Sequence, residues 1–382
     1  MSDPVAAARA LQPRIREAAA AIERERKLPA ALVREFLDAG LFHMLIPRSL
    51  GGPEIDPITA ARVVQEVATA DGSAGWCVMI AAQNATFAGM LPAKDAEEIW
   101  SNGGIAAGTA RPTGRAVWTH EPADGYIVSG RWPFASGSSH ATWLMGECIV
   151  YDGESPRKNA QGDDVTRALF VPRRDVTIHD TWDTMGLRGT ASNDFSVENV
   201  FVPESRGFQM IVDPPVHPGA LYTALPLVFM NHGSHALGVA HGALDAATEI
   251  ISTRRGWGNQ PLREQPRMQL TIAEATALVE SAERYLYDAA AELWEAATGG
   301  VEDTARLRAR VRLAASHATR ASVQAVDLVH GAVATSAIFT GSPLERQFRD
   351  IHTAAAHVMI GPLTYQAAGR VQLGLGPDFP FF

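Results

Sequence analysis

The feature that most constrains the fold of this chain is a change of hydrophobic periodicity, from helical spacing to alternation and back. Apolar residues recur at helical intervals up to about residue 104, alternate with polar ones from 105 to 213, and return to helical spacing after Pro214 and Pro215. Helices and strands separated along a chain in this way build an α+β fold. We therefore expect an N-terminal helical domain (1–104), a middle β-domain (105–213) and a C-terminal helical bundle (214–382).

Turn and cap residues place several elements within these domains. Asp71 or Ser73 is expected to cap a helix that runs to Gln83, because their side chains accept from free backbone amides. The turn sequence 122–125, Pro-Ala-Asp-Gly, separates two alternating runs and predicts a hairpin. The expected strands are 117–120, 126–129, 144–151, 168–171 and 195–202, and the expected long helices are 238–254, 267–298 and one with an apolar stripe from Leu307 to Leu328.

The composition excludes several classes of protein. The chain has 382 residues, of which 46% are hydrophobic, and its net charge of −9 argues against nucleic acid or an anionic membrane as partner. No apolar run approaches the roughly 20 residues that span a bilayer, and the first residues do not read as a signal peptide. Cys77 and Cys148 lie far apart without Cys-x-x-Cys spacing, so we expect reduced thiols in a cytoplasmic protein.

Nucleotide and metal motifs are absent. There is no Gly-x-Gly-x-x-Gly after a strand and no Gly-x-x-x-x-Gly-Lys, so no nicotinamide dinucleotide or nucleoside triphosphate site is expected. His232, His235 and His241 lie close together in the sequence, but residues 214–244 contain no Asp or Glu to complete a metal site. We therefore expect no metal.

The stretch 132–143, Trp-Pro-Phe-Ala-Ser-Gly-Ser-Ser-His-Ala-Thr-Trp, has the composition of a pocket wall. A flat heterocycle with a polar edge needs aromatic faces, close backbone approach and hydroxyl groups. Trp132, Ser136, Gly137 and Ser138 supply all three. The alternative is an ordinary connection between strands, in which Ser and Gly only satisfy the turn.

Two further segments resemble a known family. Residues 182–204 are similar to the segment that closes the middle domain of the acyl-CoA dehydrogenase superfamily, and 344–350 resembles its C-terminal Arg-Asp signature, here Arg349-Asp350. The resemblance runs over nearly the whole chain. It implies an acyl-CoA dehydrogenase fold, with a middle β-barrel or sandwich and a C-terminal four-helix bundle that assembles a homotetramer.

One residue of that family pattern is missing. The family's catalytic Glu lies eight residues beyond the Arg-Asp aspartate, a position that is Val358 in this chain. The family's other position for this base falls within 214–244, which is free of acidic residues. Because a dehydrogenase needs a base to remove the α-proton, the dehydrogenation reaction is disfavoured.

A histidine takes the place of the base. Arg349-Asp350-x-His352-x-x-x-x-His357 resembles the two-component flavin-dependent monooxygenases of this fold, and so do Gly72-Ser-x-x-Trp76 and Ser136-Gly-x-x-His140-Ala. The resemblance implies an oxidoreductase that takes reduced flavin, FMN or FAD, from a separate NAD(P)H-dependent reductase. Through a C4a-hydroperoxide it would hydroxylate an organic small molecule, with an aromatic substrate favoured. The alternatives are an acyl-CoA dehydrogenase with another base, or a non-catalytic flavin- or CoA-binding homologue.

The resemblance also implies roles for individual residues. His357 serves as acid or base, because imidazole titrates near neutrality. Ser136 or Ser138 hydrogen-bonds flavin N5 or O4, and His140 is the next candidate for the catalytic role. His352 is expected to face away, since five residues turn a helix by roughly 140°. The flavin contacts are Trp76, Trp132, Ser136, Gly137, Ser138 and Arg254, the last across a subunit boundary. Core positions for Trp76 and His357, and a solvated helix end for Arg254, remain alternatives.

Overall fold

In the computed structural model, which describes residues 3–301, 304–379 and 382, the N-terminal part is helical. Its helices are α1 (Pro4–Glu25), α2 (Ala30–Asp38), α3 (Pro57–Ala70), α4 (Gly72–Thr86) and α5 (Ala93–Trp100). Aspartates begin three of them: Asp3 accepts from the Val5 amide, Asp56 from Thr59 and Asp71 from Ala74. α4 is buried almost along its whole length, so it forms the centre of this part of the molecule.

The middle part is a single mixed sheet. Its strands are β1 (Ala106–Thr119), β2 (Gly125–Ala135), β3 (Trp143–Asp152), β4 (Ser155–Pro156), β5 (Thr166–Pro172), β6 (Thr177–His179), β7 (Asn193–Pro203) and β8 (Gly207–Phe208). Their order is β6-β7-β2-β1-β3-β5-β8, with β4 paired to β3. β1 and β3 are parallel, and the other pairs are antiparallel. The predicted hairpin is confirmed, since β1 and β2 pair up to Thr119 and Gly125.

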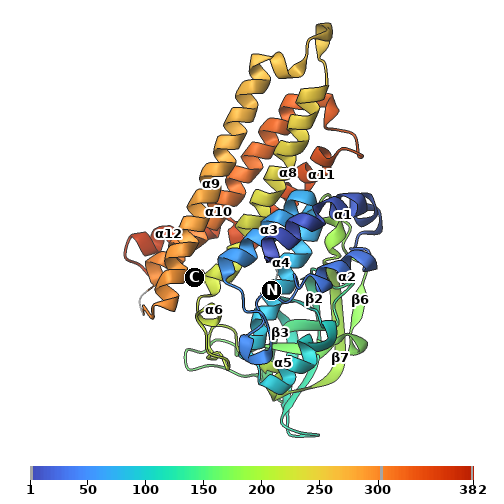
Figure 1. The fold of residues 1–382 in the computed structure, drawn as a ribbon. Coiled ribbons are helices and arrows are strands. Elements are labelled where there is room, and N and C mark those ends of the chain that lie inside the picture. Colours follow the sequence, from blue (N-terminus) through green and yellow to red (C-terminus); the bar gives the residue numbers. More distant parts are fainter. Residues whose placement is uncertain (1–2, 302–303, 380–381) are drawn as a thin grey trace.

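The C-terminal part is a bundle of long helices. α6 (Ala220–Thr223) and α7 (Leu225–Phe229) lead into α8 (Asn231–Thr253), α9 (Pro266–Thr298), α10 (Ala305–Val333), α11 (Pro343–Ala355) and α12 (Pro362–Gln372). Figure 1 shows α8, α9 and α10 side by side, extending beyond the sheet and the N-terminal helices. The apolar stripe predicted for α10 is buried from Val311 to Ala325, but Leu328 at its end is 36% exposed.

Close backbone contacts join the N-terminal helices to the bundle. α3 crosses α8 at Gly238, where a Cβ atom would lie 2.3 Å from the carbonyl oxygen of Gln65. Only glycine permits this approach without a shift of the backbone. As a result, the first turns of α8 lie against α4, which carries Trp76.

The Arg-Asp segment of α11 ties the bundle to the sheet. A carboxylate oxygen of Asp350 accepts a 2.6 Å hydrogen bond from the Leu187 amide, and Arg346 pairs with the buried Asp71. Burial raises the pKa of Asp71 and of Asp350, and the neighbouring charge of Asp71 raises the pKa of Asp350 further. The signature therefore fixes the relative positions of α4, α11 and the segment before β7.

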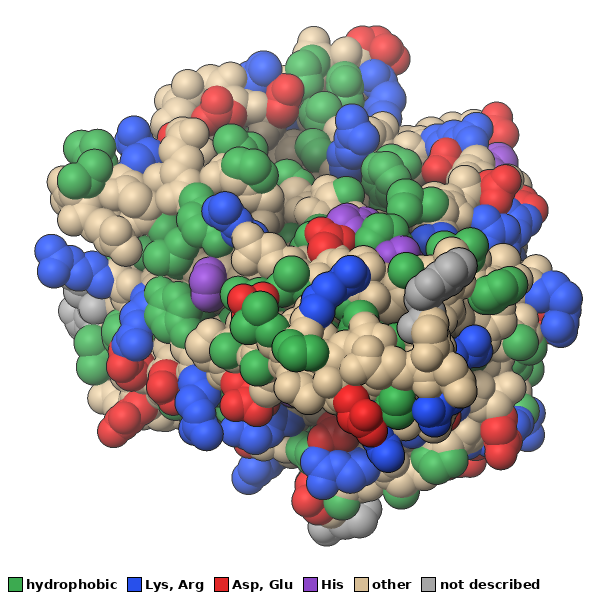
Figure 2. Space-filling model, turned by 90° about the horizontal axis from the view of Figure 1, so that it is seen from above, with side chains coloured by type: hydrophobic (Ala, Val, Ile, Leu, Met, Phe, Trp, Pro, Cys, Tyr) green, Lys and Arg blue, Asp and Glu red, His purple; other side chains and the backbone are tan. Residues whose placement is uncertain are grey.

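Charged and apolar side chains are mixed on the face of the molecule seen from above, as Figure 2 shows. None of the helices in the described ranges is both long enough and apolar enough to cross a bilayer.

Candidate active site

Trp76 is the centre of the candidate site. Its indole is buried, and its Nε1 donates a 3.0 Å hydrogen bond to the Ser136 hydroxyl. Three imidazole rings lie against it edge-on, with centroid distances of 5.1 Å for His235, 5.5 Å for His232 and 5.6 Å for His357. Helices α4 and α8, the turn after β2 and the segment after α11 therefore meet at one point.

His232 and His235 lie on one face of α8, because they are separated by three residues. Nδ1 of His232 donates to the Phe229 carbonyl at 3.1 Å, and Nε2 of His235 donates to the Gly72 carbonyl at 2.8 Å. These bonds assign the neutral tautomers and leave Nε2 of His232 and Nδ1 of His235 as buried acceptors without a partner. Burial lowers the pKa of His235 to about 4 and that of His232 well below its ordinary value, so both rings are neutral at pH 7.

His357 lies in the connection between α11 and the turn η10 (Val358–Ile360) and is half-buried. Its ring stacks on His232 with centroids 4.5 Å apart. Its Nδ1 accepts a 3.3 Å hydrogen bond from the Met359 amide, which leaves the proton of the neutral ring on Nε2. Burial and then the charge of Arg312 lower the pKa of His357 to about 4.

The other histidine of this motif faces elsewhere. His352 pairs with Asp327 at 2.9 Å and packs against Phe348. Its separation from the site was predicted from helical geometry, but the physical reason is different. α11 ends at Ala355, so His357 lies outside the helix that carries His352.

Hydroxyl groups join the turn after β2 to the segment before β7. Ser136 Oγ lies 2.6 Å from Ser192 Oγ, which lies 2.7 Å from Thr190 Oγ1, and Ser138 donates to the Ala191 carbonyl at 2.7 Å. Gly137 has φ +84°, a conformation that favours glycine, and its amide donates to the Thr190 carbonyl. The predicted pocket wall, 132–143, and the segment 182–204 that resembles the family are thus in direct contact.

Trp132 lies in the core of the sheet. Its ring stacks on Phe195 with centroids 4.9 Å apart, and its Nε1 donates to the Glu147 carbonyl at 2.7 Å. Gly114 and Gly146 leave room for the ring, since Cβ atoms there would lie 2.1 and 2.6 Å from it. The indole therefore fills the sheet core, where it can support the turn but cannot face a ligand.

Neither His140 nor Arg254 contacts the Trp76 ring in the described residues. The ring of His140 stacks on Phe42 at 5.7 Å, and its Nδ1 is buried without a partner. Arg254 is exposed at the end of α8, 19 residues after His235 and thus roughly 28 Å along the helix. Within one chain, Arg254 therefore lies far from the imidazoles around Trp76.

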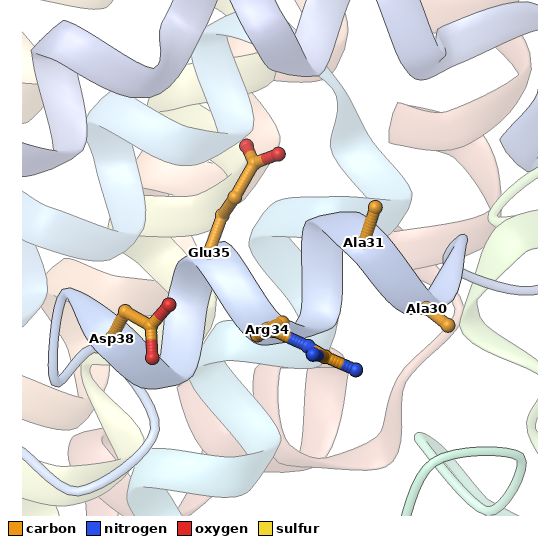
Figure 3. A pocket seen from close by; sticks show the side chains of 5 residues that line it. All are labelled: Ala30, Ala31, Arg34, Glu35 and Asp38. Atoms are coloured by element: carbon orange, nitrogen blue, oxygen red, sulfur yellow. The ribbon is translucent and has the colours of Figure 1, made fainter.

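Two hollows lie near these elements. One of about 200 Å³ adjoins the hydroxyl network and is lined by Glu25, Arg26, Lys27, Ser139, Asp180, Trp182, Ala191 and Asn193. Ligand pockets measure roughly 300 Å³ or more, so it holds only part of a flavin within one chain. A second, of about 390 Å³, lies on the surface of α2. There Arg34 and Glu35 point in different directions, as Figure 3 shows, and Glu35 is already paired with Arg14, so the hollow offers no catalytic group.

Comparison with known proteins gives the same fold and a more specific class. Residues 5–94 and 230–362 match the N-terminal and C-terminal domain models of the acyl-CoA dehydrogenases. The indole-3-acetate monooxygenase of Pseudomonas putida is 30% identical over 363 residues, covering 93% of this chain and 90% of that protein. The oxygenase subunit HsaA of the flavin-dependent monooxygenase of Rhodococcus jostii is 29% identical over 381 residues, covering 96% and 97%.

Solved structures agree with these relatives. The 3-HSA hydroxylase of Rhodococcus sp. RHA1 superposes with a TM-score of 0.91 at 26% identity, covering all of both chains. XiaF of Streptomyces sp., solved with FADH2 and glycerol, superposes with a TM-score of 0.89 at 25% identity, covering 99% of this chain and 97% of that one.

Fold and comparisons together define a flavoprotein of the acyl-CoA dehydrogenase type. The chain belongs to the acyl-CoA dehydrogenase family and, within it, to the flavin-dependent monooxygenases of two-component systems, as the oxygenase component. It is an enzyme that depends on reduced flavin, which a separate reductase supplies.

Sequence reasoning missed the roles of His232 and His235. It considered them only as metal ligands, and within the described residues no group of three or more His, Cys, Asp or Glu side chains is arranged to hold a metal. Their three-residue spacing at the start of an apolar helix was the available signal. It showed that they share a face, but it could not show that the face meets Trp76.

Proposed function

We propose that this oxygenase hydroxylates an aromatic substrate held beside the stacked rings of His232 and His357. The observation that supports the proposal most is the set of neutral imidazoles around Trp76, with two buried nitrogen acceptors that have no partner. Buried polar atoms are nearly always satisfied, so unpaired acceptors favour a ligand that donates a hydrogen bond. A phenolic hydroxyl or an indole N–H is such a donor.

The two kinds of ring nitrogen have complementary tasks. Nε2 of His232 accepts a hydrogen bond from the hydroxyl or N–H group of the substrate, which increases the electron density of the substrate's ring. Nε2 of His357 carries a proton and donates a hydrogen bond to the oxygen-bearing group. Bound reduced flavin supplies the activation of O2, and the buried surroundings of Trp76 exclude water.

For the flavin, we propose contacts from Trp76, Ser136, Gly137 and Ser138, because the hollow beside their turn fits part of a ring system. The remainder would lie against a second chain, with Arg254 of that chain binding phosphate. A homotetramer is the assembly we propose, and FMN and FAD both suit this arrangement. Buried free cysteines and the need for a nicotinamide-dependent reductase support a cytoplasmic location.

The acyl-CoA dehydrogenase reaction is disfavoured by the residue at the position of the base and by the buried carboxylates. Val358 stands at the position of the base and is 57% exposed. The buried carboxylates Asp71 and Asp350 hold backbone amides and are therefore engaged in structure. Neither carboxylate is therefore free to remove an α-proton.

The test supplies chemically reduced flavin and ¹⁸O2 to the purified enzyme together with a panel of phenols and indoles. The expected result is one ¹⁸O atom in the product, measured by mass spectrometry. The parallel reaction contains oxidised flavin and acyl-CoA esters without oxygen. Bleaching of the flavin in that reaction, with no ¹⁸O incorporated into any aromatic compound, would refute the proposal.

A further inference from the structure

Arg312 is a fully buried cation in the middle of the bundle. It lies on α10, and its Nη2 donates a 2.9 Å hydrogen bond to the Met359 carbonyl. Its Nε and Nη1 have no hydrogen-bond partner. Because a guanidinium has five N–H groups, at least three of them are left without an acceptor.

No negative charge compensates Arg312 in the described part of the chain. It belongs to none of the ion pairs there, and the groups that face it are the rings of Phe229 and Phe382, 5.6 and 5.9 Å from its Cζ. Burial lowers its pKa to about 10, so it stays charged at pH 7. Since an isolated buried charge is costly, the arrangement favours a ligand that brings an anion.

The position of Arg312 links this charge to the active site. Met359, which receives its hydrogen bond, follows His357 by two residues and donates to that ring. The charge of Arg312 also lowers the pKa of both His357 and His232, whereas that of His235 is not affected in this way. Arg312 is therefore within electrostatic reach of the stacked imidazole pair.

We propose that Arg312 binds a carboxylate of the substrate, so that the enzyme acts on aromatic acids. This inference rests on the proposed function and adds the chemical class of the substrate. The ring to be oxygenated lies at the imidazole pair, and the acidic side chain extends toward α10. A carboxylate fits better than a phenolate, because it is already ionised at pH 7 and its two oxygens accept from a guanidinium.

The first experiment uses the unaltered protein. Isothermal titration compares indole-3-acetate with indole-3-acetamide, which share the ring and the length but differ in charge. A charge-assisted hydrogen bond in a buried site predicts roughly 10- to 100-fold tighter binding of the acid. Equal affinities would overturn the proposal without any question of misfolding.

The second experiment uses three variants. Arg312→Gln should abolish the preference for the acid, and Arg312→Lys should retain part of it, because lysine keeps the charge but loses the planar fork. Arg310→Gln is the matched control, since Arg310 lies on the same helix, is partly exposed and pairs with Glu292. A preference for the acid that survives in Arg312→Gln would also overturn the proposal.

Binding and turnover distinguish the two proposals. If the acid binds preferentially but no ¹⁸O enters any product, the hydroxylation proposal fails and the role of Arg312 stands. If neutral and acidic aromatics bind and are hydroxylated equally well, the proposal for Arg312 fails and the hydroxylation proposal stands.

Discussion

Replacing His357 with alanine is expected to lower the yield of hydroxylated product roughly 100-fold, while the protein still folds. With its pKa lowered to about 4, the ring is protonated in only about one molecule in a thousand at pH 7, so its neutral Nε2–H is the active form. Loss of a general acid or base costs about 10²- to 10⁴-fold. We expect the lower end, because His232 lies 4.5 Å away and substitutes in part.

Stability changes little in this variant. The ring of His357 contacts Trp76 and His232, and each aromatic contact contributes roughly 0.5–1.5 kcal/mol. The free energy of unfolding of a folded domain is about 5–15 kcal/mol, so most of it remains. His352→Ala is the matched control, since it removes only a partly exposed pair with Asp327, worth about 0–1 kcal/mol.

The assay measures substrate oxygenated against H2O2 released, at a fixed amount of reduced flavin. His357→Ala should shift the balance toward H2O2, and His352→Ala should not. Equal losses in both variants, or unfolding of His357→Ala, would return His357 to a structural role. An unchanged ratio of oxygenated substrate to H2O2 in His357→Ala would move the catalytic assignment to His140, the next candidate from the sequence, or to His232.

Three further predictions concern stability and flavin binding. The pKa of Asp350 is raised in the folded state, so the contribution of this carboxyl to stability is present below about pH 4 and is lost as the pH rises through about 7. In urea unfolding, Asp350→Asn should therefore gain stability relative to wild type between pH 5 and pH 8. A difference in unfolding free energy that stays constant over this range would contradict the prediction. Ser136→Ala leaves Nε1 of Trp76 without its acceptor, which should lower the free energy of unfolding by about 1–3 kcal/mol in the same urea assay. An unchanged urea midpoint would indicate that Nε1 has another hydrogen-bond partner. Arg254→Ala should weaken binding of reduced flavin at least tenfold in anaerobic titration and leave the melting temperature unchanged, and undiminished affinity would exclude the contact across subunits.

Local structure was largely predictable from the sequence. Asp71 caps α4 because a carboxylate satisfies free amides wherever a helix begins, and the turn at 122–125 closes a hairpin because its residues suit a tight turn. The exchange of a base for Val358, with His357 beside it, could also be read from spacing alone. These features depend on residues close together in the chain.

The arrangement of the site depended on contacts between distant residues. Trp132 and Trp76 are both buried tryptophans next to small residues, and only the fold shows that one fills the sheet core while the other meets three imidazoles. Arg312 is indistinguishable in sequence from the exposed arginines of α10 near it. Periodicity predicts that a helix face is buried but not what it is buried against.

The sequence by itself determined the class of fold, because the change of hydrophobic periodicity follows from residue identity and local spacing. Its resemblance to the flavin-dependent monooxygenases implied that a histidine stands in for the carboxylate base. The tertiary structure decided which histidines share a site, that Trp132 is excluded from it, and that Arg312 lies unpaired beside it. The physical reason is that burial and hydrogen bonding are properties of neighbours in space, which packing of α4, α8, α10 and the turn after β2 brings together.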